Sequence, residues 1–167
     1  MVRDAERAFW DDALAGQGFA ELVCEDASQP QGEDVRRFAK LLARAHRDIF
    51  AVEEVDTRAA RLVDAWSGTE LLVTHLDEAQ RIALELAEGL MDARVVAPDI
   101  GPRLFVSPGA FHHPAEAFDP AMDVLGAARE RNLDTGAVLD ALLRMELVFR
   151  TSSRVKIAFA YRAAALK

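Results

Sequence analysis

The chain has 167 residues, of which 51% are hydrophobic, and this is enough apolar material for the core of one domain. Its formal net charge of −8 disfavours general binding to nucleic acid or to anionic membranes, because phosphate groups repel an acidic surface. A single cysteine, Cys24, excludes an internal disulfide framework and a cysteine-rich zinc site.

The first seven residues mix both charge signs and lead into no apolar run, which is untypical of a signal peptide. No stretch approaches the roughly 20 apolar residues that a membrane-spanning helix needs. We therefore expect a cytoplasmic protein without a membrane span.

Residues 1–24 are predicted to form an N-terminal helical segment that is amphipathic and carries Trp10. The polar residues that follow include one proline and one glycine and indicate a linker over 25–33. If this linker tethers the helix, the apolar face of the helix can bind another subunit. Residues 34–167 are then expected to form an α+β domain.

A second helix is predicted from Asp34, which suits the capping position, to about Asp48. Its apolar residues recur at intervals of three and four, so that they share one face. They are Val35, Phe38, Leu41, Leu42 and Ala45.

A central β-module is predicted over residues 49–107, where short apolar runs alternate with turn residues. Gly68 suits a tight hairpin, because glycine adopts a positive φ angle without a steric penalty. A connection or short helix over 77–86 separates the third strand from the fourth. The five expected strands are 49–55, 60–66, 70–76, 89–97 and 103–107.

Two further helices are predicted after the module, over 115–130 and 136–149, and the second is expected to be the most buried helix. Asn132 suits the position just beyond the first of these helices, where a left-handed backbone is common. Asp134 or Thr135 suits the N-cap of the second.

Residues 154–161 alternate apolar and polar side chains, which favours an extended segment slightly over a helix. The predicted fold class is α+β. We expect a small antiparallel five-stranded curved sheet, or a partly open barrel, flanked by N-terminal and C-terminal helices.

The order of four short stretches, 50–55, 62–70, 89–95 and 104–109, carries a resemblance. Within residues 49–114 this order resembles a small β-module of uncharacterised bacterial proteins, some of which carry it beside SEC-C-type zinc-binding motifs. The resemblance implies a fold and a bacterial protein, but no known reaction. The SEC-C cysteines are absent from this chain, so the resemblance implies no zinc site.

Two adjacent histidines, His112 and His113, are the most noticeable polar pair in the sequence. A metal site needs three or four converging ligands, which His75, Glu116 or Asp119 would have to complete. The alternative is a loop whose histidines pack against the next helix or cap it.

The C-terminal segment is basic in an otherwise acidic chain. Residues 150–167 carry five basic residues and no acidic ones, and the remainder carries 15 basic and 28 acidic residues. This segment can bind an acidic partner, or it can fold against the chain's own acidic surface.

Glycine-rich phosphate-binding loops are missing from the sequence. We therefore predict a non-enzymatic protein-interaction or adaptor module, and we leave the question of enzyme activity open. The alternative is a metal-dependent enzyme or metal-binding protein with its site near His112 and His113.

We expect no cofactor. We also expect the partner to be a protein or a second copy of the chain, rather than nucleic acid, a membrane or an identified small-molecule substrate. The candidate interaction residues are Trp10, Trp66, His112, His113, Arg154, Lys156 and Arg162.

Overall fold

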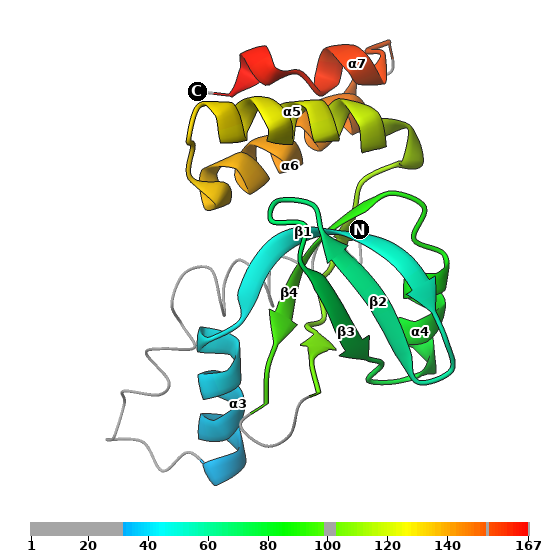
Figure 1. The fold of residues 1–167 in the computed structure, drawn as a ribbon, viewed down its shortest axis with the longest axis vertical. Helices are drawn as coiled ribbons and strands as arrows, with labels where there is room; N and C mark the ends of the chain where they lie inside the picture. The colour runs from blue at the N-terminus through cyan, green and yellow to red at the C-terminus, as the bar shows by residue number, and fades with distance from the viewer. Residues whose placement is uncertain (1–31, 99–102, 153, 167) are drawn as a thin grey trace.

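The computed structural model describes residues 32–98, 103–152 and 154–166. Figure 1 shows a curled sheet with helices beside it, and a layer of helices stacked above the sheet. In chain order the elements are α3 (Glu33–Ala43), β1 (His46–Val55), β2 (Ala59–Asp64), β3 (Glu70–Thr74), α4 (Glu78–Glu85), β4 (Leu90–Val96), β5 (Phe105–Val106), β6 (Phe111–His112), the 3-10 helix η2 (Ala115–Ala117), α5 (Phe118–Glu130), α6 (Thr135–Thr151), α7 (Ile157–Ala160) and the 3-10 helix η3 (Ala163–Ala165).

The sheet has the strand order β3-β2-β1-β4-β5, with the short strand β6 also paired to β4, and these pairs are all antiparallel. An irregularity in β1 between Val52 and Glu54 bends the strand, as bulges do. The two ends of the sheet meet at a parallel bridge between Val73 and Leu104, where the Thr74 N–H donates a 2.7 Å hydrogen bond to the Leu104 carbonyl. The predicted α+β class with a curved antiparallel sheet is confirmed, and the sheet forms a half-barrel.

Two hydrophobic cores lie on the two faces of the sheet, because successive residues of a strand point to opposite faces. Ile49 of β1 and Leu90 of β4 belong to the core under the helical layer. Their neighbours Phe50 and Met91 belong to the core inside the curl, together with Leu84 of α4. Burial of one such side chain stabilises the fold by about 1.5–3 kcal/mol. Because β1 and β4 supply side chains to both cores, these strands join the two halves of the molecule.

The predictions for Gly68, Asn132 and Asp134 are confirmed. Gly68 has a φ angle of 76° in the β2–β3 hairpin, and Asn132, just beyond the C-cap of α5, has a φ angle of 53°. Asp134 caps α6, because its carboxylate accepts a 2.9 Å hydrogen bond from the Ala137 N–H.

The helix predicted from Asp34 to Asp48 is wrong at both ends. α3 ends at Ala43, and residues 46–48 belong to β1, where backbone pairing with β4 outweighs the helical pattern. The N-cap of α3 is Gly32, which offers no side chain for a hydrogen bond, and Asp34 lies in the first turn instead.

The extended segment favoured for residues 154–161 is also wrong, because residues 157–160 form the helix α7. A strand pattern produces a strand only where a sheet edge is available for pairing. This segment packs on the helical layer instead, and the helical turn buries Tyr161 there, with 2% of its surface exposed.

The sheet spans residues 46–112, so it begins three residues before the predicted β-module and ends five residues after it. The predicted N-terminal segment 1–24, with Trp10 and Cys24, lies outside the described residues, as does most of the predicted linker 25–33. None of the helices in the described part of the chain combines the length and the apolar content that crossing a bilayer requires.

Candidate functional site

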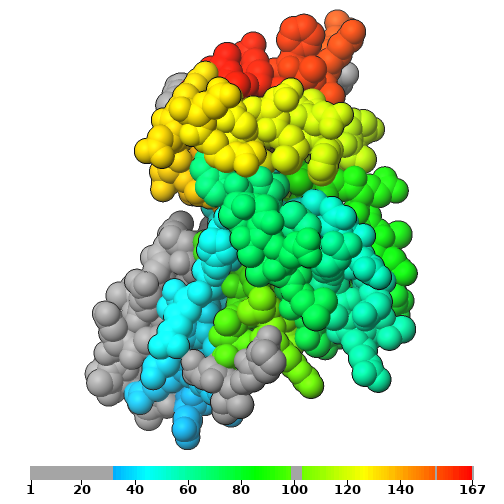
Figure 2. Space-filling model, viewed as in Figure 1, coloured from blue at the N-terminus to red at the C-terminus, as the bar shows by residue number. Residues whose placement is uncertain are grey.

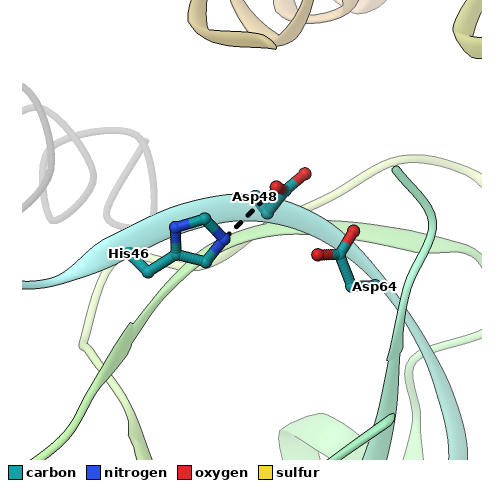
Figure 3. A group of neighbouring side chains, drawn as sticks. All are labelled: His46, Asp48 and Asp64. Carbon is teal, nitrogen blue, oxygen red and sulfur yellow. Dashed lines mark ion pairs between the residues drawn. The ribbon is translucent and has the colours of Figure 1, made fainter. Parts of the chain in front are cut away.

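A cluster of one histidine and two aspartates lies where β1 and β2 run side by side (Figure 3). His46 and Asp48 share one face of β1, because they are two residues apart in a strand. Asp64 ends β2 and pairs with Phe50, two residues further along that same face. One ligand atom of each side chain lies within 4.8 Å of those of the other two.

The two carboxylates of the cluster are buried, whereas its imidazole is open to solvent. Asp48 is 3% exposed and Asp64 is 5% exposed, but the His46 side chain is 64% exposed. His46 Nε2 lies 3.3 Å from an Asp48 carboxylate oxygen. The cluster therefore combines a buried pair of carboxylates with an imidazole at the surface.

The hairpin after β2 fixes the Asp64 carboxylate. One oxygen accepts hydrogen bonds from the Trp66 N–H at 2.7 Å and the Ser67 N–H at 3.0 Å. The other oxygen accepts a 2.7 Å bond from the Ser67 hydroxyl. An aspartate that binds the backbone two and three residues ahead is typical turn chemistry, so this part of the site follows from the local sequence.

Burial raises the pKa of the Asp48 carboxyl, and the nearby negative charge of Asp64 raises it further. The hydrogen bond from the Ile49 N–H and the proximity of His46 oppose these effects. The strand alternation turns Arg47 to the opposite face, where it pairs with Asp92 at 2.8 Å and Asp140 at 2.9 Å.

A groove of about 400 Å³ opens beside the cluster. The three cluster residues line it together with Leu71 at one side and Thr135, at the start of α6, at another. A small solute in this groove would therefore lie against the cluster.

The two adjacent histidines that the sequence singled out border the same groove but differ in burial. His112 lies on β6 and lines a groove of about 540 Å³ that α4 and α6 border. His113 is buried, with its Nδ1 atom 2.6 Å from the Tyr161 hydroxyl. His75, which could have joined them, directly follows β3, and its Nε2 atom lies 3.0 Å from the Asp56 carbonyl oxygen in the β1–β2 turn.

A chain of buried hydrogen bonds runs from His113 into the helical layer. The Tyr161 hydroxyl donates its one hydrogen to Glu146 at 2.7 Å, so the His113 Nδ1–H must donate to the Tyr161 oxygen. Glu146 also accepts a 2.6 Å bond from Arg150. Burial and the Glu146 carboxylate raise the pKa of Tyr161 well above its usual value.

Among the described residues, the side chains that lie close enough together to hold a metal ion as a group of three are His46, Asp48 and Asp64. This group includes neither His112 nor His113. Sequence reasoning missed it because residues 46–48 were assigned to a helix, where a spacing of two residues does not bring side chains to one face. The alternation of a histidine and an aspartate on a strand was the signal that could have found it.

Trp66 is half-buried beside the hairpin and packs on the core under the helical layer. The guanidinium of Arg129, on α5, lies 5.9 Å from the centre of the Trp66 ring. It also donates a 3.3 Å hydrogen bond to the Trp66 carbonyl oxygen. Trp66 thus connects the hairpin to α5, and a role in partner binding stays a prediction.

The C-terminal residues fold back on the helical layer and leave their basic side chains outside. Tyr161 is buried, whereas Arg154, Lys156 and Arg162 are exposed. Phe159, between the last two, is 67% exposed. Figure 2 shows this end of the chain on the outer surface of the molecule.

No family model matches the chain, and the comparisons with curated proteins and with solved structures found no match. The resemblance of residues 49–114 to the bacterial β-module accordingly stays a prediction.

Proposed function

We propose that this protein is a non-enzymatic protein-interaction module that binds an acidic segment of a partner through its C-terminal basic surface. This surface consists of Arg154, Lys156, Phe159 and Arg162. The observation that carries the proposal is the position of a 67% exposed phenylalanine among three exposed cations. An aromatic ring beside arginine is typical of the residues that dominate protein interfaces.

The fold fixes the C-terminal basic surface without using its basic side chains. Tyr161 and Leu166 are buried and attach the segment to α5 and α6. Within the described residues, Arg154, Lys156 and Arg162 form no ion pair. Their charges therefore stay available to a partner.

Charge complementarity favours an acidic protein segment as the ligand. The chain outside residues 150–167 has a net charge of −13, so a nucleic acid that reached the basic surface would meet repulsion around it. A short acidic peptide would contact the cations and avoid the acidic remainder. Binding rather than catalysis is proposed because the C-terminal basic surface consists of cations and an aromatic ring, without a carboxylate or an imidazole that could act as a general base.

The test selects acidic peptides from a display library with the full-length protein and measures their affinity by fluorescence anisotropy. We expect affinity to fall as salt rises, because the cations contribute through charge. The triple variant R154E/K156E/R162E should lose binding, and F159A should weaken it by roughly tenfold, the cost of about 1.4 kcal/mol.

The matched control is K40E/R58E/R103E, which changes the net charge equally at three exposed residues of other elements. It should bind as the unmodified protein does. Equal loss in both triple variants would mean that net charge alone acts and would contradict the proposal. Sedimentation velocity distinguishes a second copy of the chain as the acidic partner, because self-association would then disappear in the first triple variant alone.

A further inference from the structure

We propose that His46, Asp48 and Asp64 form a binding site for a divalent transition-metal cation, such as Mn²⁺ or Zn²⁺. The site is separate from the C-terminal basic surface and stands independently of the function proposed there. It provides one nitrogen and at least two oxygen ligands, a mixed set that suits these ions better than Mg²⁺, which prefers oxygen alone.

The spacing of the three side chains fits an ion between them. Metal–ligand distances of about 2.0–2.2 Å place two ligand atoms on opposite sides of an ion no more than about 4.4 Å apart. The ligand atoms here lie within 4.8 Å of one another. A shift of about 0.4 Å among these side chains therefore suffices to complete the site.

The charges of the cluster favour a cation. Two carboxylates that are at least 95% buried face each other, and a buried charge is costly unless it is paired. In the described part of the chain, the basic side chain within ion-pair distance of this pair is the exposed His46, since Arg47 is turned to the other face of β1. A bound divalent ion would therefore pair both buried carboxylates at once.

The carboxylates are held in place before any ion binds. Asp64 accepts three hydrogen bonds from the Trp66 and Ser67 positions, and Asp48 accepts one from the Ile49 N–H at 2.8 Å. Such outer bonds orient metal ligands. The second Asp64 oxygen accepts a single hydrogen bond, so at least one oxygen of each carboxylate keeps a lone pair for an ion. The adjoining groove of about 400 Å³ leaves room for water or an added ligand at the remaining coordination positions.

A simpler account treats His46–Asp48 as an ion pair and Asp64 as a turn residue only. The two accounts differ in what His46 does. In a metal site its imidazole is a ligand of the ion. In the simpler account its imidazole pairs only with the Asp48 carboxylate, and no ion binds.

The test is isothermal titration of the tag-free, metal-stripped, full-length protein with MnCl₂, ZnCl₂ and MgCl₂ separately. We expect one Mn²⁺ or Zn²⁺ per chain, with Zn²⁺ bound more tightly than Mn²⁺ and Mg²⁺ most weakly. H46A and D48N should each weaken binding by at least the roughly 10–100-fold that loss of an outer partner costs. Electron paramagnetic resonance of bound Mn²⁺ gives an independent readout.

Matched controls are H75A and D123N, which remove a histidine and an exposed carboxylate away from the cluster and should bind the ions as the unmodified chain does. Because H46A alters an exposed side chain, its fold is expected to persist, and circular dichroism checks this for each variant. The proposal is overturned if neither Mn²⁺ nor Zn²⁺ binds stoichiometrically, or if H46A and D48N both keep the unmodified affinity.

Discussion

Tyr161 is the residue through which a short C-terminal segment is joined to the chain just after the sheet. Its hydroxyl donates to Glu146 on α6 and accepts from His113, which follows β6. All three groups are buried, so each relies on the others for its hydrogen bonds. Sequence reasoning singled out His113 as a ligand candidate, but its partner lies 48 residues away and no local pattern announces such a pair.

Replacement of Tyr161 by phenylalanine should destabilise the protein by about 1–3 kcal/mol, because it leaves a buried donor and a buried carboxylate without their shared partner. Chemical denaturation measures the change. T151V, which removes an exposed hydroxyl from α6, is the matched control and should change stability by less than about 0.5 kcal/mol. Equal stability of Y161F and the unmodified chain would contradict this account.

The pH dependence of the same pair of proteins gives a second readout. The pKa of Tyr161 is raised in the folded state, so the fold keeps the phenol proton where the unfolded chain, with a tyrosine pKa of about 10, loses it. Its contribution to stability is therefore complete below about pH 10 and falls as the pH rises further. Y161F should show a shallower decline above pH 10.

Single residues also show which predictions the sequence supports. Gly68, Asn132 and Asp134 were predictable because each serves its own turn or helix end, within three residues of its partners. The cluster of His46, Asp48 and Asp64 was not, since Asp64 meets Asp48 only through the pairing of β1 with β2, which the helical assignment of residues 46–48 concealed.

At the scale of elements, β4 is held against the chain that follows β6. Gly89, directly before β4, lies under the backbone of His113 and Pro114. A Cβ atom there would approach the His113 carbonyl oxygen to 2.6 Å and the Pro114 carbonyl oxygen to 3.2 Å. Glycine at this position thus permits the close passage of two backbone segments.

The substitution G89A should therefore destabilise the protein by about 1–3 kcal/mol, because backbone atoms must shift to admit the methyl group. Thermal and chemical denaturation measure this. G126A is the matched control: a Cβ in the interior of α5 meets nothing within 4 Å and should stabilise the helix by roughly 0.5–1 kcal/mol. A neutral or stabilising G89A would contradict the observed packing.

The elements that local patterns misassigned are those whose state depends on distant partners. α7 carries the alternation of a strand, but it lies on helices and has no sheet edge to join. β6 has only two residues and exists because β4 pairs with it. The longer elements, such as α5 and α6, follow from their own apolar periodicity.

For the whole molecule, the decisive feature is that β1 and β4 supply side chains to both hydrophobic cores. Ile49 and Leu90 lie under the helical layer, and Phe50 and Met91 lie within the curl. The two faces of these strands are therefore buried only when the helical layer and the curled sheet are folded together. The class of fold and its helical flanks were predictable from period and order, whereas this sharing required the strand pairings.

We expect one cooperative unfolding transition for the described fold. In a W10F background Trp66 is the single tryptophan, so its fluorescence reports the sheet–helix junction, and circular dichroism reports all helices. The two transitions should coincide, and L90A should move both together by about 2–5 kcal/mol. L72A, at a 65% exposed residue of β3, is the control and should move neither. Separate transitions would mean that the halves are independent.

The bridge between Val73 and Leu104 has a consequence for how the protein reaches this structure. The meander β1–β2–β3 joins neighbours in sequence, but the bridge closes a loop of some 30 residues for a single pair of residues. Closing a long loop costs chain entropy before it returns any bonding, so non-local contacts form slowly. We therefore expect the nascent chain to pass through an open, flatter sheet that rolls up last along this seam, and the same seam to be where the native half-barrel first opens.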